Sequence, residues 1–293
     1  MVKSSLKRAL LIAGPTASGK SALAMRLAAE RGGVIINADA MQVYGELRVL
    51  TARPSTEDER RVPHRLYGHV SGTKDFSVAQ WLKDAEAEIK AAWKAGALPI
   101  LAGGTGLYFK ALEQGLAEVP AVPDEIREKW RNYKGDLAHE LALRDPISAA
   151  NLKPGDRQRL ARALEVIEAT GKPLRHWQRQ AQGRALLAGV QTERLYLDVP
   201  RQVLYARAEE RFELMIAGGA VDEVRPLIGL DPELSMMRAI GVPEIRDYLL
   251  GRISLAAASE AAKLATRHYV KRQLTWWRNQ MRGWNLLDQV ADG

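Results

Sequence analysis

The chain has 293 residues, enough for one large α/β domain with an insertion or for two domains. It contains no cysteine, which excludes disulfide bonds, thiolate zinc sites and cysteine nucleophiles. Its net charge of +8 (43 basic minus 35 acidic residues) fits a polyanionic partner such as nucleic acid, but it also fits a merely well-solvated surface.

The first predicted strand leads into a phosphate-binding loop. Residues 9–13 form a short apolar run that is typical of a buried strand. The pattern G-x-x-x-x-G-K-[ST] then follows as Gly14, Pro15, Thr16, Ala17, Ser18, Gly19, Lys20 and Ser21. In such a loop the backbone N–H groups surround a phosphate chain, the lysine adds positive charge, and the Ser21 hydroxyl is a ligand for Mg²⁺. A predicted helix follows at once, so its N-terminus also faces the phosphate. ATP and GTP sites have this motif, but the motif alone does not identify the phosphate.

Strands and helices alternate from residue 8 to about 116. Apolar runs at 34–36 and 98–102 predict two more strands, with helical spacing over 81–95 and from about 107. This alternation predicts an α/β fold, a P-loop kinase-like parallel sheet flanked by helices. Ligands bind at the carboxyl ends of such strands, where Gly14, Asp39 and Thr105 stand.

The pattern changes at Pro120 and Pro123. Residues 124–183 have helical periodicity and dense charge, with proline and glycine marking the turns. We therefore expect a helical insertion over 119–188, between core segments 1–118 and 189–293. The alternation resumes with a strand at 195–199 and with helices at 202–217 and 255–282, the last of which is basic and carries tryptophan.

Two residues beside the phosphate loop are candidates for the chemistry. Asp39 can act as a general base on a nucleophile, ligate Mg²⁺, or cap the next turn. Thr105 lies in the turn Gly103-Gly104-Thr105-Gly106, where its hydroxyl would suit a leaving oxygen. An NTPase usually has an acidic end on a second strand, whereas 98–102 ends in glycine and threonine. A small-molecule or nucleotide kinase stays open as an alternative, with three candidate phosphate clamps: Arg201, Arg207 and Arg211.

One helix of the insertion has a polar face that suits nucleic acid. Leu160 and Leu164 point inward, while Gln158, Arg162 and Glu165 share the opposite face. Glutamine and arginine can hydrogen-bond bases and phosphates, although an ordinary exposed helix has the same pattern. The five histidines have no metal-ligand spacing, so we expect no transition-metal site.

Taken together, these segments resemble the tRNA dimethylallyltransferase family, also called tRNA isopentenyltransferases. The order and spacing of the matches span most of the chain. They are the phosphate loop 14–21, Asp39-Ala40-Met41-Gln42-Val43-Tyr44, Thr51-Ala52-Arg53-Pro54, Val62-Pro63-His64, 103–108, 158–165, Ala239-Ile240-Gly241 and 269–276. The family usually has serine where this chain has Ala40, and tyrosine where it has Val242.

The resemblance implies transfer of a dimethylallyl group from dimethylallyl diphosphate to N6 of the adenosine just 3′ of the anticodon. Asp39 would be the general base and Thr105 would bind the bridging oxygen, while residues 14–21 would hold the diphosphate with Mg²⁺ on Ser21. It also implies that the target base leaves the anticodon stack to reach the site. The tRNA-contacting residues implied in the same way are Asp39, Ala40, Met41, Gln42, Thr105, Arg127, Gln158, Arg159, Leu160, Ala161 and Arg162.

We therefore predict an RNA-modifying prenyltransferase. The expected cofactor is Mg²⁺, and the expected partners are dimethylallyl diphosphate and the anticodon stem-loop of tRNA, bound by the insertion. We expect a cytoplasmic monomer without membrane association, since no stretch approaches the roughly 18 apolar residues of a membrane span. The alternatives are the kinase and a non-catalytic, nucleotide-regulated RNA-binding protein.

Overall fold

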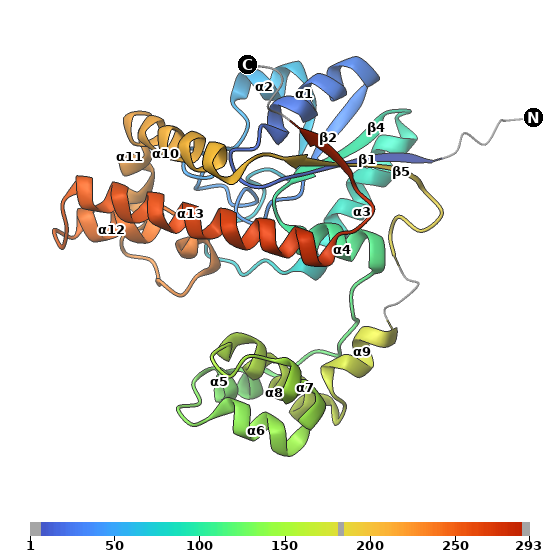
Figure 1. Ribbon diagram of the computed structural model, residues 1–293, viewed down its shortest axis with the longest axis vertical. Coiled ribbons are helices and arrows are strands. Elements are labelled where there is room, and N and C mark those ends of the chain that lie inside the picture. Colours follow the sequence, from blue (N-terminus) through green and yellow to red (C-terminus); the bar gives the residue numbers. More distant parts are fainter. Residues whose placement is uncertain (1–6, 181–184, 289–293) are drawn as a thin grey trace, which may run out of the picture. The chain divides into compact units, whose positions relative to one another are not determined.

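The computed structural model describes residues 7–180 and 185–288 (Figure 1). The chain divides into two compact units, one formed by Met1–Lys110 with Gly189–Gly293 and the other by Ala111–Ala188. The predicted segments 1–118, 119–188 and 189–293 include residues 1–6, 181–184 and 289–293, which lie outside the described residues.

The first unit is built on a parallel sheet of six strands in the order β3-β2-β4-β1-β5-β6. The strands are β1 (Arg8–Ala13), β2 (Gly33–Asn37), β3 (His64–Arg65), β4 (Leu98–Gly103), β5 (Gln191–Asp198) and β6 (Asn285–Asp288). The predicted parallel sheet is thus confirmed. The outer strands β3 and β6 were not predicted, because they are short and their burial patterns show no run of buried residues.

Helices surround this sheet. Those that begin in the first unit are α1 (Lys20–Arg31), α2 (Thr56–Arg61), α3 (Val78–Lys94), α4 (Gly106–Gln114), α10 (Arg201–Ala217), α11 (Ala220–Val224), α12 (Val242–Leu249) and α13 (Leu255–Gln280), with short 3₁₀ turns η1 (Arg225–Leu227) and η2 (Ser235–Arg238). No helix among residues 7–180 and 185–288 is long and apolar enough to cross a membrane.

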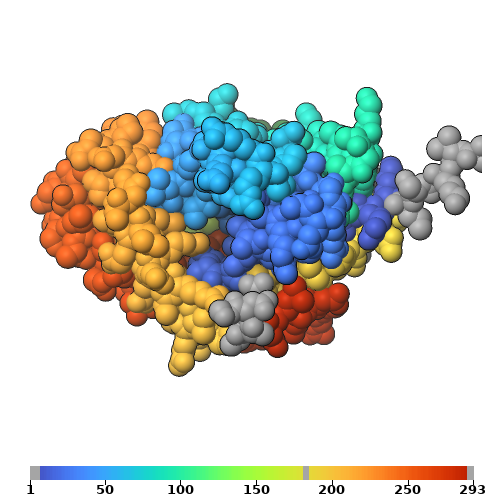
Figure 2. All heavy atoms as spheres, turned by 90° about the horizontal axis from the view of Figure 1, so that it is seen from above, coloured from blue at the N-terminus to red at the C-terminus, as the bar shows by residue number. Residues whose placement is uncertain are grey.

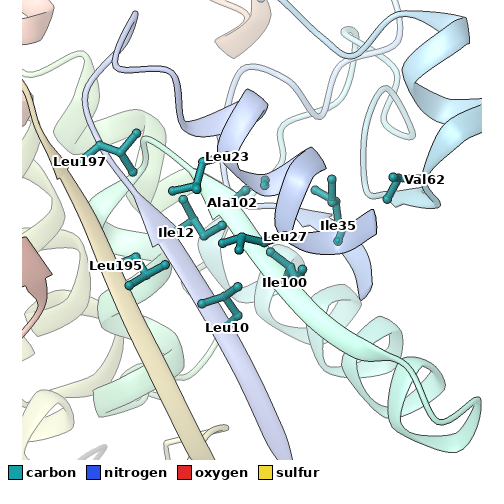
Figure 3. Close-up of a cluster of buried hydrophobic side chains, with 12 residues drawn as sticks. Leu10, Ile12, Leu23, Leu27, Ile35, Val62, Ile100, Ala102, Leu195 and Leu197 are labelled. Atoms are coloured by element: carbon teal, nitrogen blue, oxygen red, sulfur yellow. The ribbon is translucent and has the colours of Figure 1, made fainter. Parts of the chain in front are cut away.

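Alternate residues of the strands build a core on each face of the sheet. Leu10 and Ile12 of β1 pack with Leu23 and Leu27 of α1 on one face (Figure 3). On the other face, Tyr196 of β5 contacts the ring of Trp277 on α13. Strands covered on both sides are nearly continuous apolar runs, which is why the central strands could be predicted.

Helix α13 packs against α10 through apolar contacts and ion pairs. Val199, Leu204 and Val270 form a buried cluster between them. Lys263 pairs with Glu213 of α10, and Arg267 pairs with Glu209 at 3.2 Å. Part of the basic surface predicted for this helix is therefore used for packing within the molecule.

The second unit has a helical core of its own. Its helices are α5 (Asp124–Arg131), α6 (Leu137–Arg144), α7 (Pro146–Asn151), α8 (Arg157–Thr170) and α9 (Leu174–Gln180). Trp130, Leu141, Leu160 and Leu164 pack at its centre. The indole N–H of Trp130 donates to Glu168 at 2.8 Å, which satisfies the polar atom of this large core side chain.

Candidate active site

The phosphate loop joins β1 to α1 and opens at the carboxyl edge of the sheet. Ala17 and Gly19 adopt positive φ angles of 62° and 88°, so the backbone curls before Lys20 begins the helix. Consecutive turns of this kind orient N–H groups toward a common centre, which is how such loops hold phosphate. A side chain at Gly14 would collide with the hydroxyl of Ser18, since the Cβ would stand 2.7 Å from it.

Asp39 follows β2 and is held by the buried amide of Asn37. The Asn37 Oδ1 accepts from the backbone N–H of Asp39 at 2.8 Å, and its Nδ2 donates to the Asp39 carbonyl at 3.0 Å. One carboxylate oxygen of Asp39 accepts from the N–H of Met41 at 3.0 Å. Asp39 therefore caps the next turn, which was one of its predicted roles. Its side chain also lines a cavity, so it is placed for a second role as well.

Thr105 lies between β4 and α4 and contacts the residues on either side of Asp39. Its hydroxyl accepts from the N–H of Ala40 at 2.9 Å, and its own N–H donates to the carbonyl of Ala38 at 3.2 Å. Gly103 permits this approach, because a Cβ there would stand 2.1 Å from the backbone of Ala38. The predicted proximity of the two strand ends is therefore present in the structure.

Two side chains from distant helices reach the phosphate loop. Arg211 of α10 donates to the hydroxyl of Thr16. Gln273 of α13 accepts from the N–H of Thr16 at 2.9 Å and donates to the carbonyl of Gly104 at 3.1 Å. Of the candidate clamps Arg201, Arg207 and Arg211, only Arg211 is among the cavity-lining residues within the described ranges.

Two cations, Lys20 and Arg211, and one carboxylate, Asp39, interact electrostatically at this edge of the sheet. Burial lowers the pKa of the Lys20 ammonium to about 8; Asp39 acts against the shift and Arg211 adds to it. Burial also lowers the pKa of the Arg211 guanidinium, again with Asp39 acting against it. Two cations in a desolvated site are destabilised until an anion joins them.

A cavity of about 470 Å³ lies over these groups. Thr16, Asp39, Thr105 and Arg211 line its polar part. Its other walls include the apolar or aromatic side chains of Leu50, Phe212, Met215, Ile240, Tyr269 and Trp276. Such a cavity suits a ligand with an anionic end and an apolar or flat remainder.

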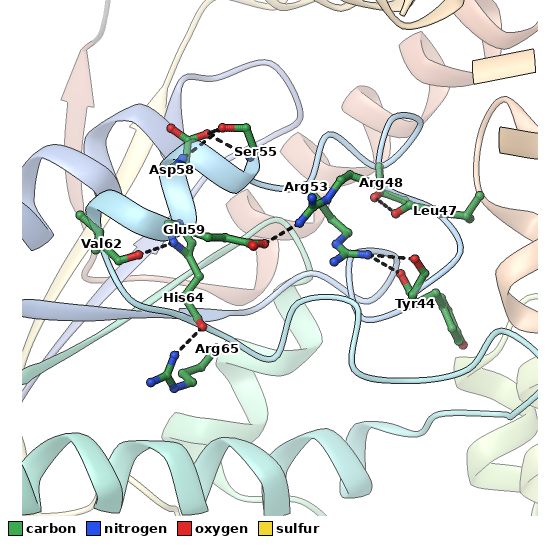
Figure 4. A network of polar contacts seen from close by, with 12 residues as sticks. Tyr44, Leu47, Arg48, Arg53, Ser55, Asp58, Glu59, Val62, His64 and Arg65 are labelled. Carbon is green, nitrogen blue, oxygen red and sulfur yellow. Dashed lines mark hydrogen bonds and ion pairs between the residues drawn. The ribbon is translucent and has the colours of Figure 1, made fainter. Parts of the chain in front are cut away.

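The segment 40–54 forms one wall and has neither helix nor strand. The Gln42 amide donates to the carbonyls of Thr51 and Ala52 at 2.8 and 3.0 Å. Arg53 donates to the carbonyls of Tyr44 and Gly45 (Figure 4). Glu223 of α11 accepts from three successive backbone N–H groups, those of residues 48–50, at 2.6, 2.7 and 2.9 Å. In Figure 2 the light-blue atoms of this region accordingly lie beside orange atoms of the 210–250 region.

Comparison with known proteins identifies the family. The model of the IPP transferase family matches residues 42–280, and that of isopentenyl transferases matches residues 7–73. A tRNA dimethylallyltransferase of Azorhizobium caulinodans is 52% identical over 97% of this chain and 95% of that protein. The chain belongs to the tRNA dimethylallyltransferase family.

Further relatives agree with this assignment. The tRNA dimethylallyltransferase of Rhodopseudomonas palustris is 54% identical over 97% of this chain and 93% of its own length. A crystal structure of a eukaryotic dimethylallyltransferase acting on tRNA superposes with a TM-score of 0.83 at 26% identity, covering 96% of this chain and 74% of that one. The family and the fold resemblance predicted from the sequence are both confirmed.

The remaining predicted tRNA-contacting residues of this family member lie in the second unit. Gln158 and Arg159 are exposed at the start of α8, and Arg127 is partly exposed on α5 beside Asp124. Leu160 and Ala161 are 0% and 5% exposed, so their side chains belong to the core of the unit. Glu165, expected on the polar face, is 3% exposed and pairs with Arg162 at 3.2 Å.

Sequence reasoning missed several residues that shape the site. Gln273 lies within the family-like segment 269–276, but its reach to two loops has no signature in the sequence. Asn37 looked like an ordinary strand end, although an asparagine two residues before a candidate base is compatible with a side-chain bond to the backbone. Glu223 lies in an ordinary helix and gave no signal.

Proposed function

We propose that this protein transfers the dimethylallyl group of dimethylallyl diphosphate to N6 of the adenosine 3′-adjacent to the anticodon in tRNA. One observation carries the proposal: a carboxylate and a hydroxyl, Asp39 and Thr105, lie beside a phosphate loop at the floor of a cavity with apolar walls. A phosphate loop alone would fit a kinase equally well. The names of the relatives, which are tRNA dimethylallyltransferases, favour the transferase.

The diphosphate would lie in the loop 14–21. Lys20 and Arg211 supply positive charge there, and the backbone N–H groups supply hydrogen bonds. A Mg²⁺ ion fits the exposed Ser21 hydroxyl at the start of α1, and it would neutralise charge on the departing diphosphate. The apolar walls would surround the five-carbon group and the adenine.

The reaction forms one bond and breaks one. The N6 nitrogen forms a bond to the terminal carbon of the dimethylallyl group as the C–O bond breaks, and the electron pair of that bond leaves with the diphosphate. Asp39 takes the proton that N6 loses, and the Thr105 hydroxyl donates to the bridging oxygen as its charge grows. Thr105 accepts from Ala40 with its lone pair, so its proton stays available for that role.

The substitution Asp39→Asn tests the base. Asparagine keeps an oxygen that can accept from Met41, but it cannot take a proton at neutral pH. Incorporation of labelled dimethylallyl diphosphate into unmodified tRNA should fall by about 10²- to 10⁴-fold, with donor binding retained. The matched control is Asp198→Asn, which alters an exposed carboxylate at the end of β5, outside the cavity lining.

One result would contradict the proposed reaction, and another would contradict only the role of Asp39. Label that enters tRNA from ATP but not from dimethylallyl diphosphate would replace the transferase by a kinase. A near-normal rate for Asp39→Asn would leave the transferase in place but remove Asp39 as the base. We also propose that the insertion binds the anticodon arm of the tRNA.

A further inference from the structure

Gln273 joins the two loops that form the floor of the cavity. It comes from α13, and its side chain is buried at 6% exposure. Its Oε1 accepts from the N–H of Thr16 in the phosphate loop at 2.9 Å, and its Nε2 donates to the carbonyl of Gly104 at 3.1 Å. The two loops follow β1 and β4, which are neighbours in the sheet.

The partners dictate which end of the amide faces which loop. A backbone N–H can only donate, so the oxygen of Gln273 must face Thr16. A carbonyl can only accept, so the NH₂ group must face Gly104. Asparagine offers the same two groups on a side chain one methylene shorter, and methionine of equal length offers neither strong group. The glutamine amide thus matches both partners at once.

The glycines that flank Thr105 leave room for two side chains of α13. A Cβ on Gly104 would stand 2.6 Å from the Nε2 of Gln273. A Cβ on Gly106 would stand 2.1 Å from the ring of Trp276. The turn that carries Thr105 is thus shaped to receive this helix on one side, while Ala38 and Ala40 hold Thr105 on the other.

We propose that Gln273 is a positioning residue that sets the separation between the phosphate loop and Thr105. The inference rests on the proposed function, in which the first holds the diphosphate and the second binds its bridging oxygen. Gln273 does not act on the substrate itself; it acts through Thr16 and Gly104. A displacement of about 1 Å between such groups typically costs about a hundredfold in rate.

The first test is Gln273→Met, which keeps the length of the side chain and removes both hydrogen bonds. The matched control is Gln280→Met, the same change at an exposed position of the same helix. At saturating dimethylallyl diphosphate and tRNA, single-turnover transfer should fall about a hundredfold in Gln273→Met and stay within about twofold in the control. The Kd for tRNA should not change. A rate for Gln273→Met within about threefold of the control would overturn the proposal.

The second test, Gln273→Glu, separates the effect of the two hydrogen bonds from the effect of side-chain packing. It also tests the proposal if Gln273→Met does not fold. In Gln273→Glu the ionised carboxylate still accepts from Thr16 but places an oxygen against the Gly104 carbonyl. The protonated acid restores the donor. The rate of Gln273→Glu relative to the native protein should therefore rise as the pH falls and the carboxylate takes up a proton.

Dividing by the native rate at each pH removes the pH dependence that the other charged groups give to the native protein. Those lining the cavity are Asp39, Arg211, Arg238 and Arg272, and Lys20 lies beside them in the phosphate loop. A ratio that does not change with pH would overturn the proposal. Failure of the proposed function looks different, since the native protein itself would then transfer no label from dimethylallyl diphosphate.

Discussion

Lys20 is the lysine of the phosphate loop, and its surroundings oppose its charge. Burial lowers its pKa to about 8, and the nearby Arg211 adds to the effect. In the same loop the hydroxyl of Ser18 is buried without a partner among the described residues. An anion in this loop would relieve the cationic repulsion, and so the pKa of Lys20 should rise when a diphosphate binds.

This coupling predicts how donor affinity depends on pH. Below pH 8 Lys20 is already charged, so binding needs no extra proton. Above pH 8 it is mostly neutral and must take up a proton as the diphosphate binds. The Kd for dimethylallyl diphosphate without tRNA, measured by calorimetry, should be flat between about pH 7 and 8, where the diphosphate is ionised, and weaken about tenfold per unit above pH 8.

The substitution Lys20→Arg provides the control for this titration. Arginine keeps the positive charge but does not lose its proton in this range. Affinity in Lys20→Arg should be lower than in the native protein, because the larger group fits the loop poorly, but it should not change between pH 8 and 9.5. The same slope in both proteins would show that another group takes up the proton.

At the scale of elements, an irregular segment supplies a wall of the cavity. Residues 48–50 belong to no helix or strand, so their backbone N–H groups have no partner of that kind. The Glu223 carboxylate of α11 accepts hydrogen bonds from all three N–H groups instead. Hydrogen bonds to a charged group are each worth about 1.5–3 kcal/mol when they are well shielded. The Glu223 carboxylate therefore holds the backbone of residues 48–50, beside the bonds that the Gln42 amide makes to Thr51 and Ala52.

The substitution Glu223→Gln should loosen this wall. Its NH₂ group would face backbone donors, so at least one of the three bonds is lost. We expect the free energy of local opening of residues 48–50 to fall by about 2 kcal/mol. Hydrogen exchange at their amides should then be roughly thirtyfold faster. Glu233→Gln, which breaks an exposed pair with Arg238, should leave these amides unchanged. Unchanged protection in Glu223→Gln would show that other contacts hold the segment.

The central strands were the most predictable parts of the fold. The runs that became β1, β2, β4 and β5 are apolar because both faces of the sheet are covered. The partners of each element could not be predicted in the same way. Lys263 and Arg267 look like a solvated basic face until α10 places Glu213 and Glu209 opposite them. Sequence periodicity reports which face is buried, but it does not report which element covers that face.

At the scale of the whole molecule, the chain consists of an α/β unit that holds the candidate chemistry and part of the candidate RNA contacts, and a helical unit that holds the others. Residues 158–162 were predicted as one tRNA-binding segment from the family resemblance. The structure divides that segment, since Leu160 and Ala161 pack inward while Gln158 and Arg159 are exposed. A motif lists consecutive residues, whereas a helix sends them to different faces.

The exposed part of α8 gives the sharpest test of RNA binding by the second unit. Arg162 is a poor choice, because removing it takes an ion-pair partner from the buried Glu165. Arg159 is 70% exposed and pairs with Asp156 at its surface. Arg159→Gln should weaken tRNA binding at low salt and reduce the slope of log Kd against log salt by about one.

The control for this variant removes a similar charge from the other unit. Arg252 is 61% exposed and pairs with Asp247, so Arg252→Gln also removes one surface ion pair. It should leave both the tRNA affinity and the salt slope unchanged. Equal effects of the two substitutions would mean that only the net charge matters, and that α8 makes no local contact.

The bridge made by Gln273 has a consequence for the order in which the molecule is completed. Thr16 and Gln273 are 257 positions apart, and the whole helical unit is synthesised between them. At about 5–20 residues per second, roughly 10–50 s pass between the synthesis of the phosphate loop and that of the helix that ties it to Thr105. A nascent chain therefore carries a complete phosphate-binding motif well before the helix that completes the cavity floor exists, and we expect full activity only after α13 has docked.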